Sequence, residues 1–91
     1  MKLIIAIVND DIAYDVIKDM SERKIRATKL SSTGGFMKKG NTTLLIGVDD
    51  SMKDEVLDAL KEISNKGPHD ESGKVANINA FVLNMSEYKR V

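Results

Sequence analysis

The sequence contains no cysteine and no tryptophan, and it has one proline, one histidine, two phenylalanines and two tyrosines among its 91 residues. Without cysteine, the chain has no disulfide framework, no thiol nucleophile and no thiolate metal ligand. The single histidine, His69, follows Pro68 in a polar segment and has no partner His or Cys at metal-binding spacing. We therefore expect no metal site and no bound cofactor.

The chain also lacks an excess of charge of either sign. Fourteen Lys and Arg residues balance fourteen Asp and Glu residues, giving a formal net charge of +0. A chain without net positive charge has no global field that attracts a nucleic acid polymer, so we expect no such partner. The apolar run at the amino terminus, residues 3–8, is too short for a membrane span or a signal peptide. We therefore expect a cytoplasmic protein that does not contact a membrane.

Hydrophobic residues make up 42% of the chain and charged residues 31%, which is ordinary for a folded domain. A chain of 91 residues is long enough for one core, and no linker or repeat divides it. We therefore predict a single domain over residues 1–91.

The periodicity of apolar residues predicts four strands and two helices. Apolar or alternating segments at 3–8, 25–30, 42–48 and 75–83 are typical of strands. Between them, apolar residues recur at helical spacing. They are Ile12, Ala13, Val16, Ile17 and Met20 in the first helix, and Met52, Val56, Ala59, Leu60 and Ile63 in the second. The order is βαββαβ, which predicts an α+β, ferredoxin-like fold: a four-stranded antiparallel sheet with two helices on one face.

Acidic clusters precede both predicted helices. Asn9-Asp10-Asp11 follows the first strand and Asp49-Asp50-Ser51 follows the third. Carboxylates in the first turn interact favourably with the helix dipole, and Asp or Ser side chains cap free N–H groups. Both clusters therefore predict helix starts.

The first and third strands are apolar on both faces. Because alternate side chains of a strand point to opposite faces, Leu3, Ile5 and Ile7 face one way and Ile4, Ala6 and Val8 face the other. Two helices can cover only one face of the sheet. We therefore predict a homo-oligomer that buries the second face, with binding sites near the subunit boundaries.

The segment from Arg23 to Asn41 combines glycines, hydroxyls and positive charge. It contains six cations and no carboxylate. The cations are Arg23, Lys24, Arg26, Lys29, Lys38 and Lys39. The hydroxyl residues are Thr28, Ser31, Ser32 and Thr33, and Thr42 follows directly after the segment. Arginine suits bidentate phosphate contacts, so Arg26 is the candidate phosphate ligand. The pattern favours a phosphate-bearing ligand.

Two further features of this segment allow more than one interpretation. Gly34-Gly35 and Gly40-Asn41 are typical of an ordinary hairpin loop, whose backbone adopts positive φ angles. Phe36 is a loop aromatic that either anchors the loop or stacks on a nucleobase, with Met37 lining the same slot. Together with the cations, these residues favour a nucleotide-like ligand.

An enzymatic function has less support. Some small ferredoxin-like phosphatases hold phosphate in the loop between the first strand and the first helix. Here that loop is Asn9-Asp10-Asp11, whose carboxylates would repel phosphate. No nucleophile beside a base is recognisable, so we expect a binding protein and not an enzyme.

Several motifs resemble the PII-like cyclic di-AMP receptors. They are Met1-Lys2-Leu3-Ile4-Ile5-Ala6-Ile7-Val8, Arg26-Ala27-Thr28-Lys29-Leu30, Thr33-Gly34-Gly35-Phe36, Gly40-Asn41-Thr42-Thr43 and Ala80-Phe81-Val82-Leu83. The similarity covers nearly the whole chain. It implies a homotrimer that binds cyclic di-AMP in clefts between subunits and signals to a downstream protein that the sequence does not identify.

The resemblance also implies roles for single residues. Arg26 would contact phosphate or ribose, and Ala27, Thr28 and Asn41 would make polar contacts with an adenine edge. The Gly35 backbone would frame the base with Phe36 and with Met37, which replaces the family's usual leucine. Gly47 would leave room for the base.

The chain departs from the family pattern at two places. Lys24 stands where better-known members carry a small amide, and a short polar turn between Ile63 and Val75 replaces a long loop that responds to ligand. Three alternatives therefore stay open: a PII-type sensor of ATP or another adenine nucleotide, a structural trimer without ligand, and, least supported, a small phosphohydrolase.

Overall fold

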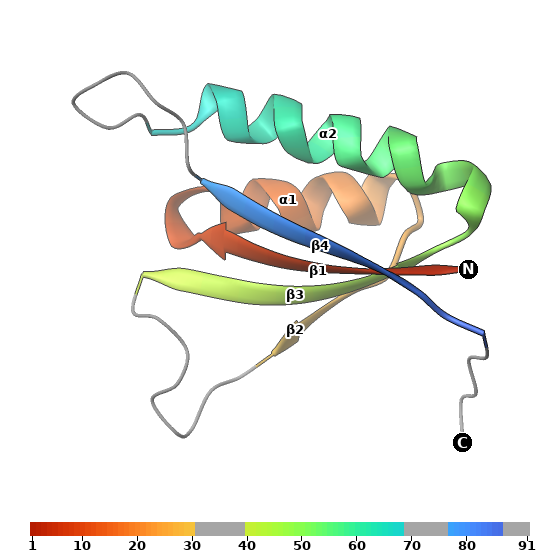
Figure 1. Cartoon of the computed structure of the whole chain (residues 1–91). Coiled ribbons are helices and arrows are strands. Elements are labelled where there is room, and N and C mark those ends of the chain that lie inside the picture. The colour runs from red at the N-terminus through yellow and green to blue at the C-terminus, as the bar shows by residue number, and fades with distance from the viewer. Residues whose placement is uncertain (31–39, 69–76, 87–91) are drawn as a thin grey trace.

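The computed structural model describes residues 1–30, 40–68 and 77–86. They form β1 (Lys2–Asn9), α1 (Asp10–Glu22), β2 (Ala27–Leu30), β3 (Asn41–Val48), the 3₁₀ turn η1 (Asp50–Met52), α2 (Lys53–Lys66) and β4 (Ile78–Asn84) (Figure 1). The strands pair antiparallel in the order β2-β3-β1-β4. The predicted ferredoxin-like α+β fold is confirmed.

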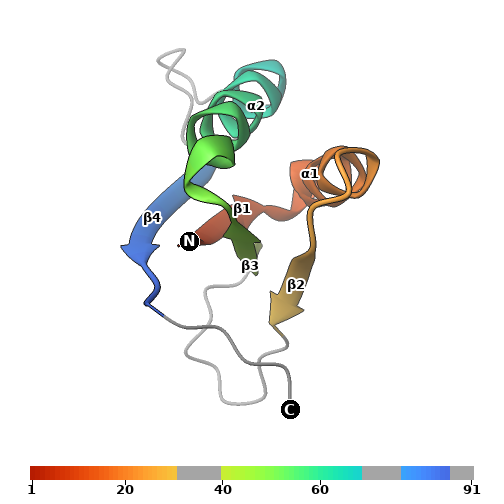
Figure 2. The same ribbon diagram turned by 90° about the vertical axis from the view of Figure 1, so that its right-hand side faces the viewer.

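Both helices lie on the same side of the sheet, as a view turned by 90° shows (Figure 2). The core between the layers takes three side chains from each of β1, α1, β3 and α2. They are Ile4, Ala6, Val8, Ile12, Val16, Met20, Leu44, Ile46, Val48, Val56, Ala59 and Leu60. The predicted helical stripes thus face the sheet, with their other members packed at the edge of the core. No helix in the described parts of the chain is long and apolar enough to span a membrane.

The first helix begins and ends with well-defined caps. The Asn9 side chain accepts a hydrogen bond from the Asp11 amide at 2.9 Å, as expected for an N-cap. At the other end Lys24 adopts φ +60°, and the Ile25 amide donates to the Met20 carbonyl at 2.8 Å. This is a Schellman motif with lysine at the position that glycine usually occupies. Because the motif uses Lys24 and Ile25, β2 starts at Ala27, two residues later than predicted.

The second helix begins differently from the prediction. Asp49-Asp50-Ser51 does not cap it, because η1 precedes α2 and neither Asp49 nor Met52 makes a side-chain cap bond. The Asp50 carboxylate interacts instead with the amino terminus. The expected start is therefore correct in position and wrong in mechanism.

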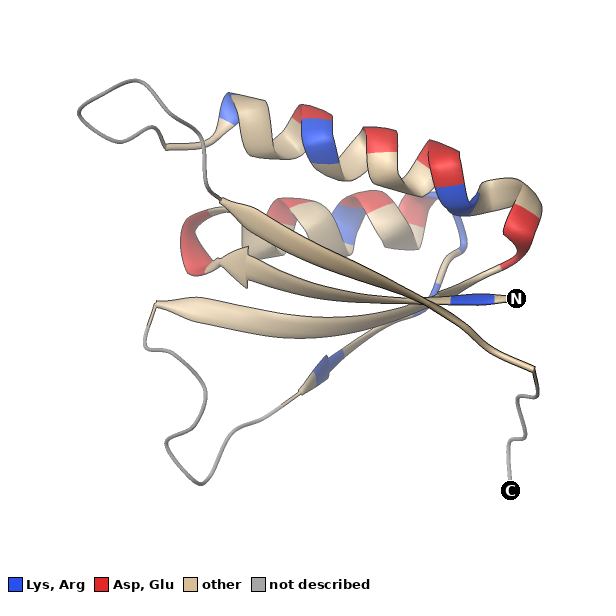
Figure 3. Cartoon of the chain, in the orientation of Figure 1, with Lys and Arg blue, Asp and Glu red and all other residues tan. Residues whose placement is uncertain are grey.

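The face of the sheet opposite the helices, called here the open face, carries no charged side chain from the described strands. The strands contain only two charged residues, Lys2 and Lys29, and their register places both on the helix side. Charges gather instead on the helices (Figure 3). The open face consists mainly of Leu3, Ile5, Ile7, Thr28, Leu30, Thr43, Leu45, Phe81 and Leu83. Phe81 is 54% exposed and Leu83 47%.

Asn77, the residue before β4, contacts the carboxyl end of α2. Asn77 is 5% exposed, and its side-chain nitrogen donates to the carbonyls of Ser64 at 2.9 Å and Pro68 at 2.8 Å. A Cβ on Gly67 would lie 2.8 Å from that nitrogen and 2.8 Å from Cγ2 of Ile12. Gly67 has φ −85°, so close approach and not backbone conformation requires glycine here.

We predict that Gly67→Ala destabilises the fold by about 1–3 kcal/mol, because the added methyl displaces Asn77 or Ile12. Urea unfolding followed by circular dichroism measures the change. Lys66→Ala, one residue earlier and exposed, is the matched control and should change stability by less than about 0.5 kcal/mol. Equal stabilities of the two variants would contradict the close-approach explanation.

Candidate functional site

A hollow of about 330 Å³ lies in the open face, where β1 begins and β3 ends. Its lining residues are Met1, Leu3, Arg26, Thr28, Leu45, Gly47 and Met85. The register explains this grouping, because Leu3 pairs with Gly47 and Thr28 pairs with Leu45 on the same face. The hollow combines an apolar floor with one guanidinium and one hydroxyl, which is a usual composition for a small-molecule site.

Gly47 keeps the floor of the hollow low. A Cβ built on Gly47 would lie 3.9 Å from Cε of Met1 and 4.0 Å from Cε of Met85. A small side chain would therefore fit without a clash, but it would occupy the space that a ligand needs. This supports the expectation that Gly47 leaves room for a bound group.

Arg26 is the cation that borders the hollow. It also borders a second hollow of about 290 Å³ that continues beyond Gly47 and is lined in part by Arg23 and Lys24. The Arg23 guanidinium pairs with Asp19 and lies 3.7 Å from Glu55, and the hydrogen bond that Arg23 donates to Asp19 raises the pKa of Arg23. Arg23 therefore links the two helices, whereas Arg26 forms no ion pair with another described residue.

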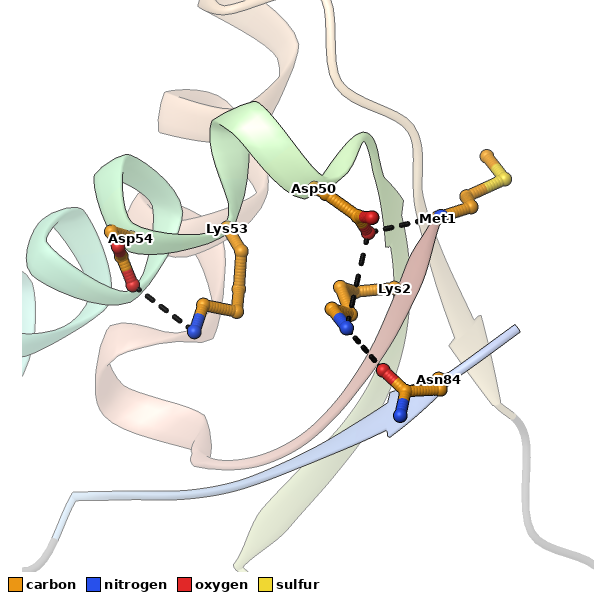
Figure 4. Close-up of polar contacts among 6 residues, drawn as sticks. All are labelled: Met1, Lys2, Asp50, Lys53, Asp54 and Asn84. Atoms are coloured by element: carbon orange, nitrogen blue, oxygen red, sulfur yellow. Dashed lines mark hydrogen bonds and ion pairs between the residues drawn. The ribbon is translucent and has the colours of Figure 1, made fainter. Parts of the chain in front are cut away.

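Polar contacts at the amino terminus hold one wall of the hollow. The Met1 ammonium lies 3.0 Å from Oδ1 of Asp50, and the Met85 amide donates to the Met1 carbonyl at 3.0 Å. Lys2 donates to the Asn84 side chain and lies 4.0 Å from Asp50 (Figure 4). The hydrogen bond from the amino terminus lowers the pKa of the Asp50 carboxyl. Met1 and Met85 are thus fixed beside Gly47.

The structure brings together three of the eight predicted ligand residues, namely Arg26, Thr28 and Gly47. Ala27 pairs with Ile46 and faces the helix side, so only its backbone on the edge strand β2 is available to a ligand on the open face. Asn41 starts β3, about 20 Å along the strand from Gly47. Gly35, Phe36 and Met37 lie outside the described residues, as do His69 and the loop cations Lys38 and Lys39.

One candidate hydroxyl has a different role from the one expected. Thr42 is 8% exposed on the helix side of the sheet, and its Oγ1 donates to Oδ1 of Asp10 at 2.6 Å. Its hydroxyl is therefore occupied within the chain and does not point towards the hollow. The expectation that Thr42 donates to a phosphate is not supported by this arrangement.

Sequence reasoning missed Met1, Leu3, Leu45 and Met85 as lining residues. Leu3 and Leu45 were recognisable only as members of an apolar strand face, and the pairing register decides which of them lie beside Arg26. Met85 belongs to the segment after β4, which had no periodicity to interpret. Antiparallel pairing of the first and third strands would have placed Met1 near Gly47.

The fold defines a ferredoxin-like domain of the PII-like type, with a hollow on the open face of its sheet. Comparison with known families gives the particular one: residues 1–88 match the cyclic-di-AMP receptor family, and the chain belongs to it. No group of three or more His, Cys, Asp or Glu side chains in the described residues is placed to hold a metal ion.

Two solved structures have similar folds. A functionally unknown protein from Pediococcus pentosaceus is 35% identical, with a TM-score of 0.76, and the match covers 99% of this chain and 96% of that one. A DUF3240 family protein from Shewanella baltica is 12% identical, with a TM-score of 0.70 and coverage of 99% and 94%. The second likeness concerns the fold alone.

We predict that Asp50→Asn lowers stability near neutral pH and has little effect in acid. Because the folded-state pKa of Asp50 is lowered, its contribution is present above the ordinary carboxyl pKa and disappears as the pH falls through the folded value. The difference in Tm from the native protein should therefore close below about pH 4. Asp58→Asn, which changes an acidic residue of α2, is the control. A Tm difference that is constant with pH would contradict the role of the ion pair.

Proposed function

We propose that this protein is a trimeric signal-transduction receptor that binds cyclic di-AMP at its subunit interfaces. The observation that carries the proposal is the position of Arg26 and Thr28 beside a hollow that opens onto an uncharged apolar sheet face. Membership of the cyclic-di-AMP receptor family supports the choice of ligand.

The open face supports the oligomer. Phe81, Leu83 and Leu30 are 54%, 47% and 39% exposed in the single chain, and no strand charge interrupts the surface they form. A contiguous apolar face of this kind is typical of a surface that another subunit covers. A closed ring of three copies buries it without leaving an open end.

The hollow supports a ligand at the subunit boundary. A cyclic dinucleotide has two phosphates and two adenines, whereas the described part of one chain offers one guanidinium and one hydroxyl at about 330 Å³. The site in a single chain is therefore too small to enclose the ligand. A neighbouring protomer, together with Asn41 and the segment containing Gly35, Phe36 and Met37, would complete it.

The chemistry of the hollow supports binding without catalysis. Its described lining contains no carboxylate and no histidine, so it offers no general base beside a nucleophile. Arg26 and Thr28 donate hydrogen bonds, which suits recognition of phosphate and of base edges. We infer a cytoplasmic receptor that needs no cofactor and reports ligand occupancy to a downstream protein.

We predict that Arg26→Ala weakens cyclic di-AMP binding about 30- to 100-fold, because a charge-assisted hydrogen bond to phosphate contributes about 2–3 kcal/mol. Lys29→Ala is the matched control: it removes the same charge three residues later in the chain, from β2, where Lys29 lies on the helix side. Its dissociation constant should stay within about threefold of the native value. Isothermal titration calorimetry measures both variants.

The same titration separates the alternatives when cyclic di-GMP and ATP are run in parallel. Binding of ATP in preference to cyclic di-AMP would indicate a PII-type sensor of adenine nucleotides. Failure of all three nucleotides would favour a structural trimer and would overturn the receptor function. Equal weakening by Arg26→Ala and Lys29→Ala would show that net charge, and not the hollow, governs affinity.

We predict that Phe81→Glu converts the trimer to monomers, because it places a charge on the open face opposite Ile5. Val82→Glu is the control, since Val82 is the next residue of β4, is 40% exposed and lies on the helix side. Sedimentation equilibrium measures the masses. A monomeric native protein, or dissociation by both variants, would contradict the proposed interface.

A further inference from the structure

A chain of hydrogen bonds crosses the end of the sheet opposite the hollow. The Thr42 hydroxyl donates to Asp10 at 2.6 Å, and the Asp10 amide donates to the Gly40 carbonyl at 2.9 Å. Both contacts fix the first residues of β3, on either side of Asn41. Gly40 adopts φ +91°, a conformation that suits glycine, so the entry into β3 is defined by this contact and by its backbone.

The same chain of contacts continues to the other polar connection. The Asn9 amide donates to the Asn77 carbonyl at 2.7 Å, and its side-chain nitrogen donates to Oδ1 of Asn77 at 3.3 Å. Asn77 in turn donates to the carbonyls of Ser64 and Pro68. All three hydrogen-bonding groups of the Asn77 amide side chain are therefore engaged.

The network thus joins two segments that are distant in sequence, residues 40–42 and residues 64–68. One end holds residues 40–42, which follow the connection between β2 and β3. The other end holds residues 64–68, which precede the connection between α2 and β4. Asp10 lies at the amino end of α1, next to the capping residue Asn9, so the contacts from Thr42 to Asn77 pass through the backbone of a helix start.

We propose that this network, Thr42–Asp10–Asn9–Asn77, positions Asn41 for ligand and couples its position to the carboxyl end of α2. Asp10 and Thr42 are positioning residues that do not touch the ligand. The inference rests on the proposed function for the part that concerns ligand. The coupling between residues 40–42 and 64–68 is a property of the chain itself.

A continuous series of contacts does not by itself show that residues 40–42 and 64–68 are energetically coupled, so the coupling is tested directly. Its test is Thr42→Val, which keeps the shape and removes the hydroxyl donor, compared with Thr42→Ser, which keeps the donor. Asp10→Ala breaks the same bond from the other side. If both residues act only through this one hydrogen bond, the double variant Asp10→Ala with Thr42→Val should change hydrogen exchange and binding no more than either single variant does.

The first measurement needs no ligand. Amide hydrogen exchange at Gly67, whose N–H donates to the Ser64 carbonyl, is compared with exchange at Ala6 in the central strand, which reports global unfolding. Thr42→Val should raise the ratio of the Gly67 rate to the Ala6 rate about fivefold or more, and Thr42→Ser should not. Val16→Ala, a core change outside the network, controls for lost stability. An unchanged ratio in Thr42→Val would overturn the coupling.

The second measurement uses cyclic di-AMP with the intact full chain. Thr42→Val should weaken binding about tenfold, as expected for loss of one hydrogen bond between Asn41 and the ligand, and should abolish ligand-induced protection of Gly67. Thr42→Ser should bind and protect like the native protein. Native affinity and protection in Thr42→Val would overturn the positioning role. Failure of the native protein to bind any nucleotide would instead overturn the proposed function, while the ligand-free ratio still decides the coupling.

Discussion

The burial of apolar surface on one side of the sheet only is the constraint on which the rest of this structure depends. Core side chains from two helices and two strands interlock above the sheet, and Ile4, Leu44 and Ile46 are fully buried there. The strands are equally apolar below. Within the described residues of one chain no third layer covers that surface, so the apolar face stays exposed and the hollow lies at its edge.

The two ends of the sheet have different roles. At one end, Gly47 and the amino terminus shape a hollow beside Arg26, and an ion pair with Asp50 holds Met1 in place. At the other end, a hydrogen-bond network through Asp10, Asn9 and Asn77 joins residues 40–42 to residues 64–68. Strands β1 and β3, paired along their whole length, connect the two ends.

Much of the fold was predictable because the patterns are local. The apolar run of β1 and the helical spacing of Ile12, Val16 and Met20 each identify an element without reference to the rest of the chain. Boundaries were less predictable. The left-handed conformation at Lys24, in a helix cap formed with Met20 and Ser21, delays β2. The interaction of Asp50 with the amino terminus, which is distant in sequence, takes away a capping residue.

The sequence by itself determined the order of elements, the two-faced character of the sheet and the family of the chain, because periodicity and motif identity are written residue by residue. Only the tertiary structure decided that Arg26, Thr28 and Gly47 share one hollow with Met1 and Met85, and that the Thr42 hydroxyl binds Asp10. The physical reason is strand register. Shifting a strand by one residue would exchange its faces, and that choice is made by pairing and packing across the whole sheet.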